Sequence, residues 1–151
     1  MIHETAIIET EVPHSTNVWS FTHISKGAKI GEECTIGENV FIGEGVKIGN
    51  RCRIQNGALI YKGVELGNDV FIGPGVVTTN DYFPELPVKD WSKRFKRTLI
   101  GDRASVGANS TIICGVTLHE DCMVGAGSVV TKDVKQNEIV IGNPARHHKW
   151  K

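Results

Sequence analysis

An amide and a carboxylate stand side by side at Asn80-Asp81, where the most regular pattern of this sequence stops. A positioned carboxylate can take up a proton from a reacting group, and an amide can orient one. Two further polar or bulky side chains, Gln55 and Tyr61, interrupt the same pattern nearby. We therefore predict that Asn80 and Asp81 belong to a functional site. The elements that hold them follow from the pattern itself.

Aliphatic residues recur at every sixth position over most of the chain. Only Thr78 breaks the series, which runs Val18, Ile24, Ile30, Ile36, Ile42, Ile48, Ile54, Ile60, Leu66, Ile72, Thr78 and resumes as Ile100, Val106, Ile112, Leu118, Val124, Val130. A fixed hexapeptide period is typical of a parallel β-helix. The sequence therefore predicts an all-β solenoid.

Each hexapeptide has the form small-x-aliphatic-Gly-x-x, as in Ala28 to Glu33. Two inward positions at alternating residues fit a short strand. Because glycine tolerates positive φ, we expect the glycine that follows the aliphatic residue to turn the corner. Three strands close a triangular coil, so each coil should comprise three hexapeptides.

The chain length of 151 residues favours one domain, 1–151. Residues 1–17 are out of phase and are expected to form a capping coil, which covers open strand edges. Residues 135–151 lose the period and form the second cap, for which a short helix is one option. Residues 79–99 are predicted to be an inserted loop, and its cations and aromatic residues favour a role over a ligand or a neighbouring subunit. A solvated loop is the alternative.

Stacking of each hexapeptide on the third one after it brings distant positions together. Tyr61 and Thr79 both occupy the glycine position and should lie one above the other. Gln55 fills another glycine position, beside Asn56. For Asn56 a purely structural ladder of asparagines at the corners is an equal alternative.

One outward column is mostly apolar: His23, Phe41, Leu59 and Val77 follow one another at intervals of three hexapeptides. An apolar stripe on the outside needs a cover, and a second subunit is the simplest one. The column therefore predicts a homo-oligomer with closed symmetry. A packed interface position is the structural alternative for His23.

Small residues stack in the later repeats, where Ala108 follows Gly107 and Ala126 follows Gly125. They should leave a shallow groove beside exposed backbone amides. Lys132 and Arg146 supply cations near one end. Such a groove suits an extended ligand that carries phosphates.

Composition limits the other possibilities. The chain is 40% hydrophobic with 17 cationic and 17 acidic residues, so its zero net charge argues against binding to nucleic acid or a membrane surface. Without a signal peptide or a membrane-length apolar run, a cytoplasmic location is expected. The four cysteines mostly occupy the small position and lack metal-ligand spacing, so we expect a structural role and no metal.

The segment Gly125-Ala126-Gly127-Ser128-Val129-Val130-Thr131-Lys132-Asp133-Val134, followed by Gly142-Asn143-Pro144-Ala145-Arg146, resembles the carboxy-terminal signature of hexapeptide acyltransferases. The resemblance implies a left-handed β-helix, a homotrimer, and acetyl-CoA bound in a groove between subunits. The groove residues would be Gly107, Ala108, Gly125, Ala126, Lys132 and Arg146.

A narrower resemblance is to bacterial nucleotide-linked amino-sugar N-acetyltransferases. It rests on Val18 to Ile24, Ile54-Gln55-Asn56, Tyr61 to Val64, Asp69 to Pro74, Thr79-Asn80-Asp81 and Arg97 to Ile100. It implies acetylation of the 3-amino group of a dTDP- or UDP-linked sugar for surface polysaccharide. Substrate would then be held by Gln55, Asn56, Tyr61, Lys89, Arg94 and Arg97.

Related sugar O-acetyltransferases place a catalytic histidine at the site that corresponds to Asn80-Asp81, and this sequence has none there. A hydroxyl needs a base near pH 7, whereas an amine needs only to be neutral, so an amino sugar fits better. We expect direct transfer in which Asn80 and Asp81 orient the amine, Asp81 or alternatively His23 accepts its proton, and orientation supplies much of the rate.

Three alternatives stay open at this point. A sugar or serine O-acetyltransferase has the same fold. A γ-type carbonic anhydrase needs three histidines around a metal, and the spacing of the histidines here argues against it. A non-catalytic β-helix would lack any use for the insertion.

Overall fold

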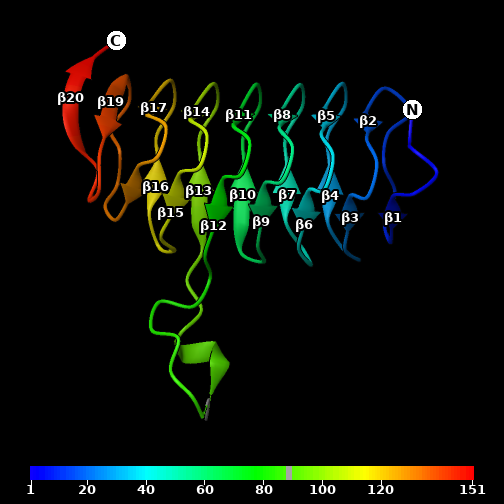
Figure 1. Cartoon of the computed structure of the whole chain (residues 1–151), viewed down its shortest axis with the longest axis horizontal. Coiled ribbons are helices and arrows are strands. Elements are labelled where there is room, and N and C mark those ends of the chain that lie inside the picture. Colours follow the sequence, from blue (N-terminus) through cyan, green and yellow to red (C-terminus); the bar gives the residue numbers. More distant parts are fainter. Residues whose placement is uncertain (88–89) are drawn as a thin grey trace.

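The computed structural model describes residues 1–87 and 90–151. They form a left-handed parallel β-helix, in which each turn of the chain adds one short strand to each of three sheets. The two ends of the chain lie at opposite ends of the solenoid (Figure 1). This confirms the all-β solenoid predicted from the hexapeptide period.

Within the described residues the three sheets contain seven, five and eight strands. Sheet I consists of β1 (Ile7–Ile8), β3 (His23–Ile24), β6 (Phe41–Ile42), β9 (Leu59–Ile60), β12 (Val77–Thr78), β15 (Thr111–Ile112) and β18 (Val129–Val130). Sheet II consists of β4 (Lys29–Ile30), β7 (Lys47–Ile48), β10 (Val64–Leu66), β13 (Thr98–Ile100) and β16 (Thr117–Leu118). Sheet III consists of β2 (Asn17–Val18), β5 (Thr35–Ile36), β8 (Arg53–Ile54), β11 (Phe71–Ile72), β14 (Ser105–Val106), β17 (Met123–Val124), β19 (Glu138–Ile141) and β20 (Arg146–Trp150).

The chain passes from sheet III to sheet I to sheet II and back, and we name each corner by the two sheets it joins. Phe41 pairs with Leu59 and Leu59 with Val77, which confirms the coil of three hexapeptides. Across the insertion Val77 pairs with Thr111, so the insertion lengthens one coil without changing the order of the sheets. The coils after the insertion therefore continue the order of the coils before it.

The core is the inner surface of the three sheets. Most two-residue strands point one side chain outward and bury the aliphatic one, and the small position before each strand is buried as well. Each fully buried isoleucine contributes roughly 1.5–3 kcal/mol. The four cysteines are free thiols and all are buried. Burial raises the pKa of Cys122 to about 12, which keeps this thiol protonated and unreactive.

The expected role of the repeated glycine was wrong. The residue in the left-handed region lies two positions later, as at Gly45 (φ 68°) and Glu33 (φ 57°). Glycine follows the aliphatic residue for a different reason: a Cβ on Gly43 would lie 2.8 Å from the amide nitrogen of Lys62 in the next coil. Close stacking of coils, and not a special dihedral angle, selects glycine there.

Both ends of the chain pair with the solenoid. Ile7–Ile8 pairs with His23–Ile24, slightly closer in sequence than a full coil, and Ile2 forms a bridge with Val18. At the other end β19 adds to sheet III in parallel, and β20 pairs with it antiparallel. A strand therefore takes the place of the short helix that was one option for this cap.

The residues that return from the insertion lie against two glycines. The ring of Phe95 packs where a Cβ on Gly63 (φ 95°) would have to go, and a Cβ on Gly115 would lie 2.9 Å from Cδ of Lys96. The returning limb, Phe95 and Lys96, therefore lies between the corner of the coil that precedes the insertion and the corner of the coil that follows it. This contact attaches the insertion to the solenoid.

Replacing Gly63 by alanine should detach this limb. Gly45 stands one coil earlier at the same corner, also has positive φ, and has open space around it. Both Gly→Ala changes should cost about 1 kcal/mol of unfolding free energy through φ, and G63A about 1–3 kcal/mol more through the clash with Phe95. Urea denaturation measures the difference, and equal losses would contradict the packing role of Gly63.

Candidate functional site

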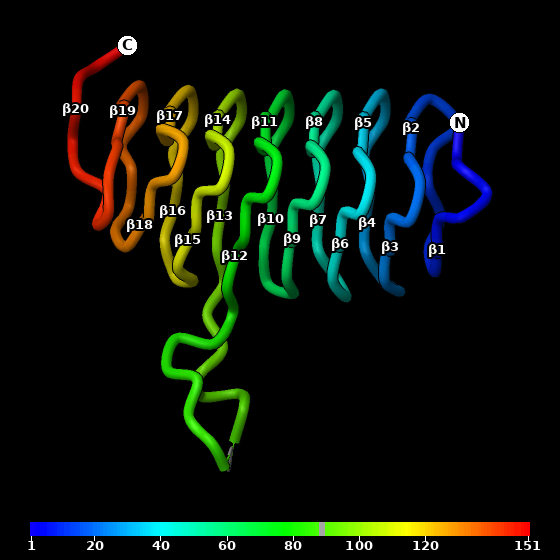
Figure 2. The backbone as a smooth tube through the Cα atoms, in the orientation of Figure 1, coloured from blue at the N-terminus to red at the C-terminus, as the bar shows by residue number. Residues whose placement is uncertain are grey.

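The insertion leaves the solenoid at the I–II corner, between β12 and β13, and stands out from the body (Figures 1 and 2). Its two limbs run side by side at the base. Asp81 forms an antiparallel bridge with Phe95, and the amide of Lys96 donates to the carbonyl of Asn80 at 3.1 Å. The base is therefore a short two-stranded ribbon that begins directly after Thr79.

A bidentate ion pair closes this ribbon. Nε of Arg94 donates to Oδ1 of Asp81 at 3.0 Å and its Nη2 donates to Oδ2 at 2.8 Å. The Phe83 amide also donates to Oδ1 at 3.1 Å. The side chains are only 11% (Asp81) and 19% (Arg94) exposed, so solvent screens the pair weakly. Both oxygens of Asp81 are therefore engaged by partners within the insertion.

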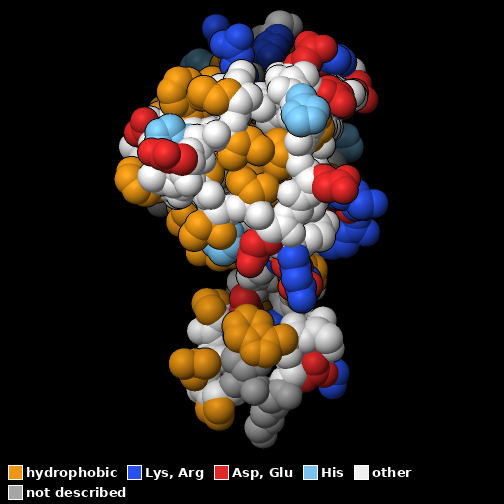
Figure 3. Space-filling view, turned by 90° about the vertical axis from the view of Figure 1, so that its right-hand side faces the viewer, with side chains coloured by type: hydrophobic (Ala, Val, Ile, Leu, Met, Phe, Trp, Pro, Cys, Tyr) orange, Lys and Arg blue, Asp and Glu red, His pale blue; other side chains and the backbone are white. Residues whose placement is uncertain are grey.

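Beyond the clamp the insertion carries a short 3-10 helix, η1 (Trp91–Lys93), capped by the Asp90 carboxylate, which accepts from the Ser92 amide. The Lys96 ammonium lies 3.8 Å from the ring centroid of Tyr82. Phe83, Leu86 and Trp91 are exposed, Leu86 by 87%. Figure 3 shows apolar side chains over this protruding part. Such a tip is suited to contact another surface.

Arg97 lies at the foot of the insertion and forms an ion pair with Glu65 on β10. Lys47 donates to the same carboxylate at 3.1 Å. The hydrogen bond from Lys47, and then the one from Arg97, hold the pKa of Glu65 below its usual value. One face of this region is a hollow of about 190 Å³ that Phe95 and Arg97 help to line.

The outer face of sheet I carries the apolar column predicted from the sequence, in register. The ring of His23 meets Phe41 edge-on at 5.7 Å, and Phe41 lies 5.4 Å from Tyr61, measured between ring centroids. Nε2 of His23 lies 3.2 Å from Oε2 of Glu9. His23 is therefore held from two sides.

The III–I corner borders the other edge of sheet I. The Gly127 amide donates to the Ala108 carbonyl at 2.8 Å, so the corners of Ala108 and Ala126 stack as predicted. Three coils before Ala126, the Asn56 side-chain oxygen accepts from the Glu38 amide at 3.0 Å. This is the ladder-like role that was the alternative for Asn56.

Gln55 shares this corner with a hollow of about 280 Å³, and the exposed indole of Trp19 lies on the other side of the hollow. The ring of Trp19 and the amide of Gln55 offer a stacking surface and a hydrogen-bonding group within one hollow.

Lys132 and Arg146 line a hollow of about 130 Å³ at the last coil, together with His147. Nδ1 of His147 lies 3.0 Å from the carboxylate of Glu138, which is buried. Lys132 follows β18 at the I–II edge, away from the corner of Ala108 and Ala126. Arg146 pairs with Ile141, whose side chain lies against Gly125 at that corner.

The predicted site residues thus fall into separate groups. Tyr61, Asn80, Asp81, Arg94 and Arg97 gather at the I–II corner. Gln55, Asn56, Gly107, Ala108, Gly125 and Ala126 lie along the III–I corner, and His23 is between them on sheet I. Lys89 lies outside the described residues. Sequence reasoning did not assign roles to Phe95 and Thr78, although Thr78 was visible as the one break in the aliphatic series.

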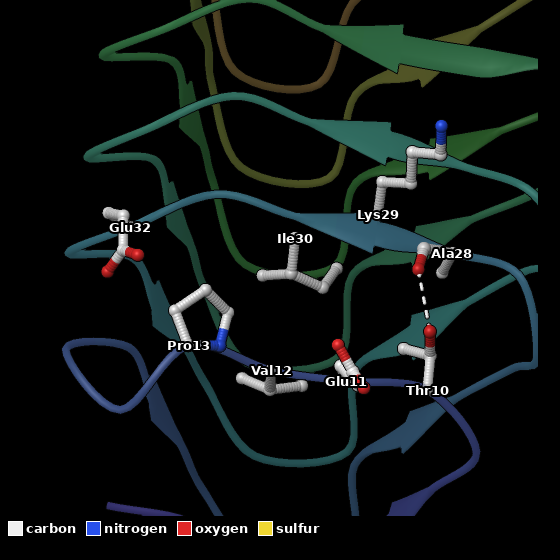
Figure 4. Close-up of a pocket in the computed structure, with 8 residues that line it drawn as sticks. All are labelled: Thr10, Glu11, Val12, Pro13, Ala28, Lys29, Ile30 and Glu32. Carbon is white, nitrogen blue, oxygen red and sulfur yellow. Dashed lines mark hydrogen bonds between the residues drawn. The ribbon is translucent and has the colours of Figure 1, made fainter.

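Another hollow is remote from all of these residues. It has a volume of about 470 Å³ and lies beside β4, the first strand of sheet II, where Thr10 to Pro13 replace a strand (Figure 4). The hydroxyl of Thr10 donates to the Ala28 carbonyl at 2.9 Å. Its position identifies it as the incomplete first coil of sheet II.

Two other kinds of site have no counterpart in residues 1–87 and 90–151. No three His, Cys, Asp or Glu side chains there are grouped so that they could hold a metal ion. No helix in this part of the chain is long and apolar enough to cross a membrane.

The hexapeptide period and the left-handed β-helix place this chain among the hexapeptide-repeat proteins. Family models agree with this: the model for the hexapeptide repeat of succinyl-transferase matches residues 97–132, and the model for the GMPPB C-terminal domain matches residues 18–85.

Two individual relatives show which members of this class the chain is similar to. The chain is 47% identical over 146 residues to dTDP-3-amino-3,6-dideoxy-alpha-D-galactopyranose 3-N-acetyltransferase of Aneurinibacillus thermoaerophilus, with 96% of this chain and 75% of that protein covered. It is 36% identical to the bifunctional protein GlmU of Trichodesmium erythraeum, over 90% of this chain and 26% of GlmU.

The same fold occurs in GDP-perosamine N-acetyltransferase of Caulobacter crescentus, crystallised with CoA and GDP-perosamine. The TM-score is 0.73 at 25% identity, over 98% of this chain and 55% of that one. This chain spans about half the length of that enzyme. The chain belongs to the hexapeptide-repeat acyltransferases, in the family of the nucleotide-linked amino-sugar N-acetyltransferases.

Breaking the clamp should release the insertion while the solenoid stays folded. In Asp81→Asn the guanidinium of Arg94 loses its charged partner, so we expect proteolytic cleavage between residues 82 and 93 to accelerate about tenfold or more. Circular dichroism should be unchanged. Asp90→Asn, which alters the cap of η1 and the ion pair with Lys93 but leaves the clamp intact, is the matched control. Equal cleavage rates in both variants would show that the pair does not hold the insertion.

Proposed function

We propose that this protein transfers an acetyl group from acetyl-CoA to the 3-amino group of a dTDP-linked 3-amino-3,6-dideoxyhexose. The observation that carries the proposal is the 47% identity to an enzyme of that name, over 96% of this chain and 75% of the relative. The product would serve surface polysaccharide synthesis. Acetyl-CoA and nucleotide sugars are cytoplasmic metabolites, which supports a cytoplasmic location for this protein.

The reaction is a direct transfer. The neutral amine attacks the thioester carbonyl, the C–N bond forms, and the C–S bond breaks in the tetrahedral intermediate. CoA leaves as a thiolate, which takes up the proton that the amine loses. Holding amine and thioester in attack geometry supplies a large share of the rate, so no acyl-enzyme is needed.

Asn80 and Asp81 serve orientation in this scheme. Because Arg94 and the Phe83 amide already occupy the Asp81 carboxylate, Asp81 acts by holding the insertion, and Asn80 next to it orients the amine. This refines the expectation that Asp81 accepts the proton. His23 remains the alternative base, although Glu9 and Phe41 hold its ring.

Acetyl-CoA is assigned to the III–I corner and the last coils. Small side chains at Ala108 and Ala126 leave backbone amides accessible along the corner, and Gly107 and Gly125 allow the close stacking that builds it. A backbone amide there can stabilise the oxyanion of the intermediate. Lys132 and Arg146 supply positive charge for the phosphates of CoA.

The nucleotide sugar is assigned to the I–II corner and the early coils. Tyr61 offers an exposed ring at the I–II corner, and Gln55 and Asn56 offer amides in the same coil at the III–I corner. Arg97 is largely exposed and can reach a diphosphate. Lys89 belongs to the same assignment by its place in the sequence. Arg94 contributes indirectly, through the clamp.

Tyr61, Asn80 and Arg97 border one edge of sheet I, whereas Ala108 and Ala126 border the other edge, so one chain does not bring these two groups together. We therefore propose a homotrimer in which the insertion of one subunit reaches the III–I corner of the next. The apolar column on sheet I and the exposed tip at Phe83, Leu86 and Trp91 are the surfaces that this assembly would cover.

The acceptor is tested by free-thiol release from acetyl-CoA with dTDP-3-amino-3,6-dideoxygalactose, UDP-3-amino-glucuronate and maltose. We expect turnover with the dTDP-amino sugar, and kcat/KM at least about a hundredfold lower with maltose, whose hydroxyl needs a general base. Preference for maltose would establish O-acetylation instead. Absence of turnover with all three would contradict the proposed reaction.

Replacing His23 separates orientation from general base catalysis. If orientation carries the reaction, His23→Gln should lower kcat by less than about tenfold, whereas loss of a general base costs about 10²–10⁴-fold. The variant Glu9→Gln, which removes only the partner of His23, is the control. A drop of a hundredfold or more in His23→Gln alone would assign the base to His23.

A further inference from the structure

Trp19 is a large aromatic residue at a position where the coils usually have glycine. It follows the buried Val18 at the III–I corner and is 43% exposed. Its amide donates to the Ile36 carbonyl at 2.9 Å, so its backbone keeps the ladder between coils. An indole that is so exposed contributes little to the core. The equivalent position of the later coils is occupied by Gly37, Gln55, Gly73, Gly107 and Gly125.

The indole forms one wall of a hollow of about 280 Å³ at this corner. Gln55, the second residue of this column that is not glycine, lines the same hollow two coils further on. Because β2, β5 and β8 lie side by side (Figure 1), Trp19 and Gln55 are separated by two strand spacings, or about 10 Å. Gly37 lies between them and has no side chain, so the space at its level stays open.

The residues that line the hollow suit a flat, uncharged ring with polar edges. The indole offers a stacking face, and the side-chain amides of Gln55 and Asn56 can donate and accept hydrogen bonds. Among the described residues of the lining, Glu38 is the one charged group, so the hollow attracts an N–H edge and repels phosphate. Pockets for whole ligands measure about 300–1,000 Å³, so this smaller hollow fits a single ring system.

The place of the hollow along the III–I corner favours a nucleotide sugar over CoA. Ala108 and Ala126, to which we assign acetyl-CoA, lie on coils that follow the insertion, whereas the hollow belongs to the coils of β2, β5 and β8. Asn80 follows β12, in the coil directly after that of Gln55. A nucleotide sugar that extends from the hollow and CoA that extends from the later coils therefore meet near the level of Asn80. In the proposed trimer this Asn80 belongs to the neighbouring subunit.

We propose that the hollow between Trp19 and Gln55 binds the pyrimidine base of the nucleotide sugar, with the indole stacked on the ring and the Gln55 amide at its edge. The ring of thymine or uracil presents an N–H group between two carbonyls. One side-chain amide matches such an edge, because its oxygen accepts from the N–H group while its nitrogen donates to a carbonyl. The assignment rests on the proposed function and deepens it, because it names the residues that hold the nucleotide.

Titration calorimetry with dTDP alone, without acetyl-CoA or an amino sugar, tests this assignment. Because an aromatic stack contributes strongly to the binding of a base, we expect Trp19→Ala to raise the Kd of dTDP about tenfold or more. Trp19→Phe should stay within about threefold of the natural protein, and the Kd of CoA should change by less than about twofold in both variants. Phe71→Ala is the matched control, since Phe71 is also an exposed aromatic residue but lies outside the hollow on sheet III, and it should leave dTDP binding unchanged.

Two results would overturn the inference directly: the same Kd of dTDP in Trp19→Ala and the natural protein, or no binding of dTDP by the natural protein. Loss of affinity for CoA alone in Trp19→Ala would overturn it as well, because adenine would then occupy the hollow. If Trp19→Ala does not fold, Trp19→Leu makes the same comparison, since leucine is apolar but offers no ring. Failure of the proposed function would appear differently, as dTDP binding that depends on Trp19 without release of free thiol from acetyl-CoA.

Discussion

The stacking of one coil directly on the next, at the spacing of hydrogen-bonded strands, governs the whole molecule. Strands in a sheet lie about 4.8 Å apart, so every corner must also fit within that height. At Gly43 a single Cβ would press on the amide of Lys62. The same spacing decides which residues face one another, because each coil repeats the register of the one before it. The corners are therefore the most constrained part of the structure. A residue that departs from the repeat at a corner needs a specific explanation.

The insertion does not disturb the stacking of the coils. Sheet II continues across it with Val64 beside Thr98, so the solenoid on either side is undisturbed. Its returning limb fits between the glycines at 63 and 115, and the pair of Asp81 with Arg94 closes its base. A carboxylate that looked available for chemistry thus serves the geometry of the loop.

Sheet I lies between the two corners to which we assign the reactants, and this position matters for the proposed mechanism. Tyr61, Asn80 and Arg97, which we propose to act on the amino sugar, lie at one edge of this sheet, and Ala108 and Ala126, which we propose to line the CoA groove, lie at the other. A rigid prism cannot fold one edge onto the other, so an assembly of several copies is the natural way to unite them. This arrangement also suits a reaction that depends on orientation, because rigid elements hold both reactants.

The sequence alone determined the coil, its length of three hexapeptides, the buried columns and the stacking of Ala108 on Ala126, because hydrophobic period and strand geometry are linked residue by residue. It also located the insertion and singled out Thr78 as an exception. Only the tertiary structure decided that glycine serves close stacking, that Arg94 occupies Asp81, and that Lys132 lies across sheet I from Ala126. Those facts depend on where chain segments meet in space, and a local period contains no information about contacts made by residues that leave it.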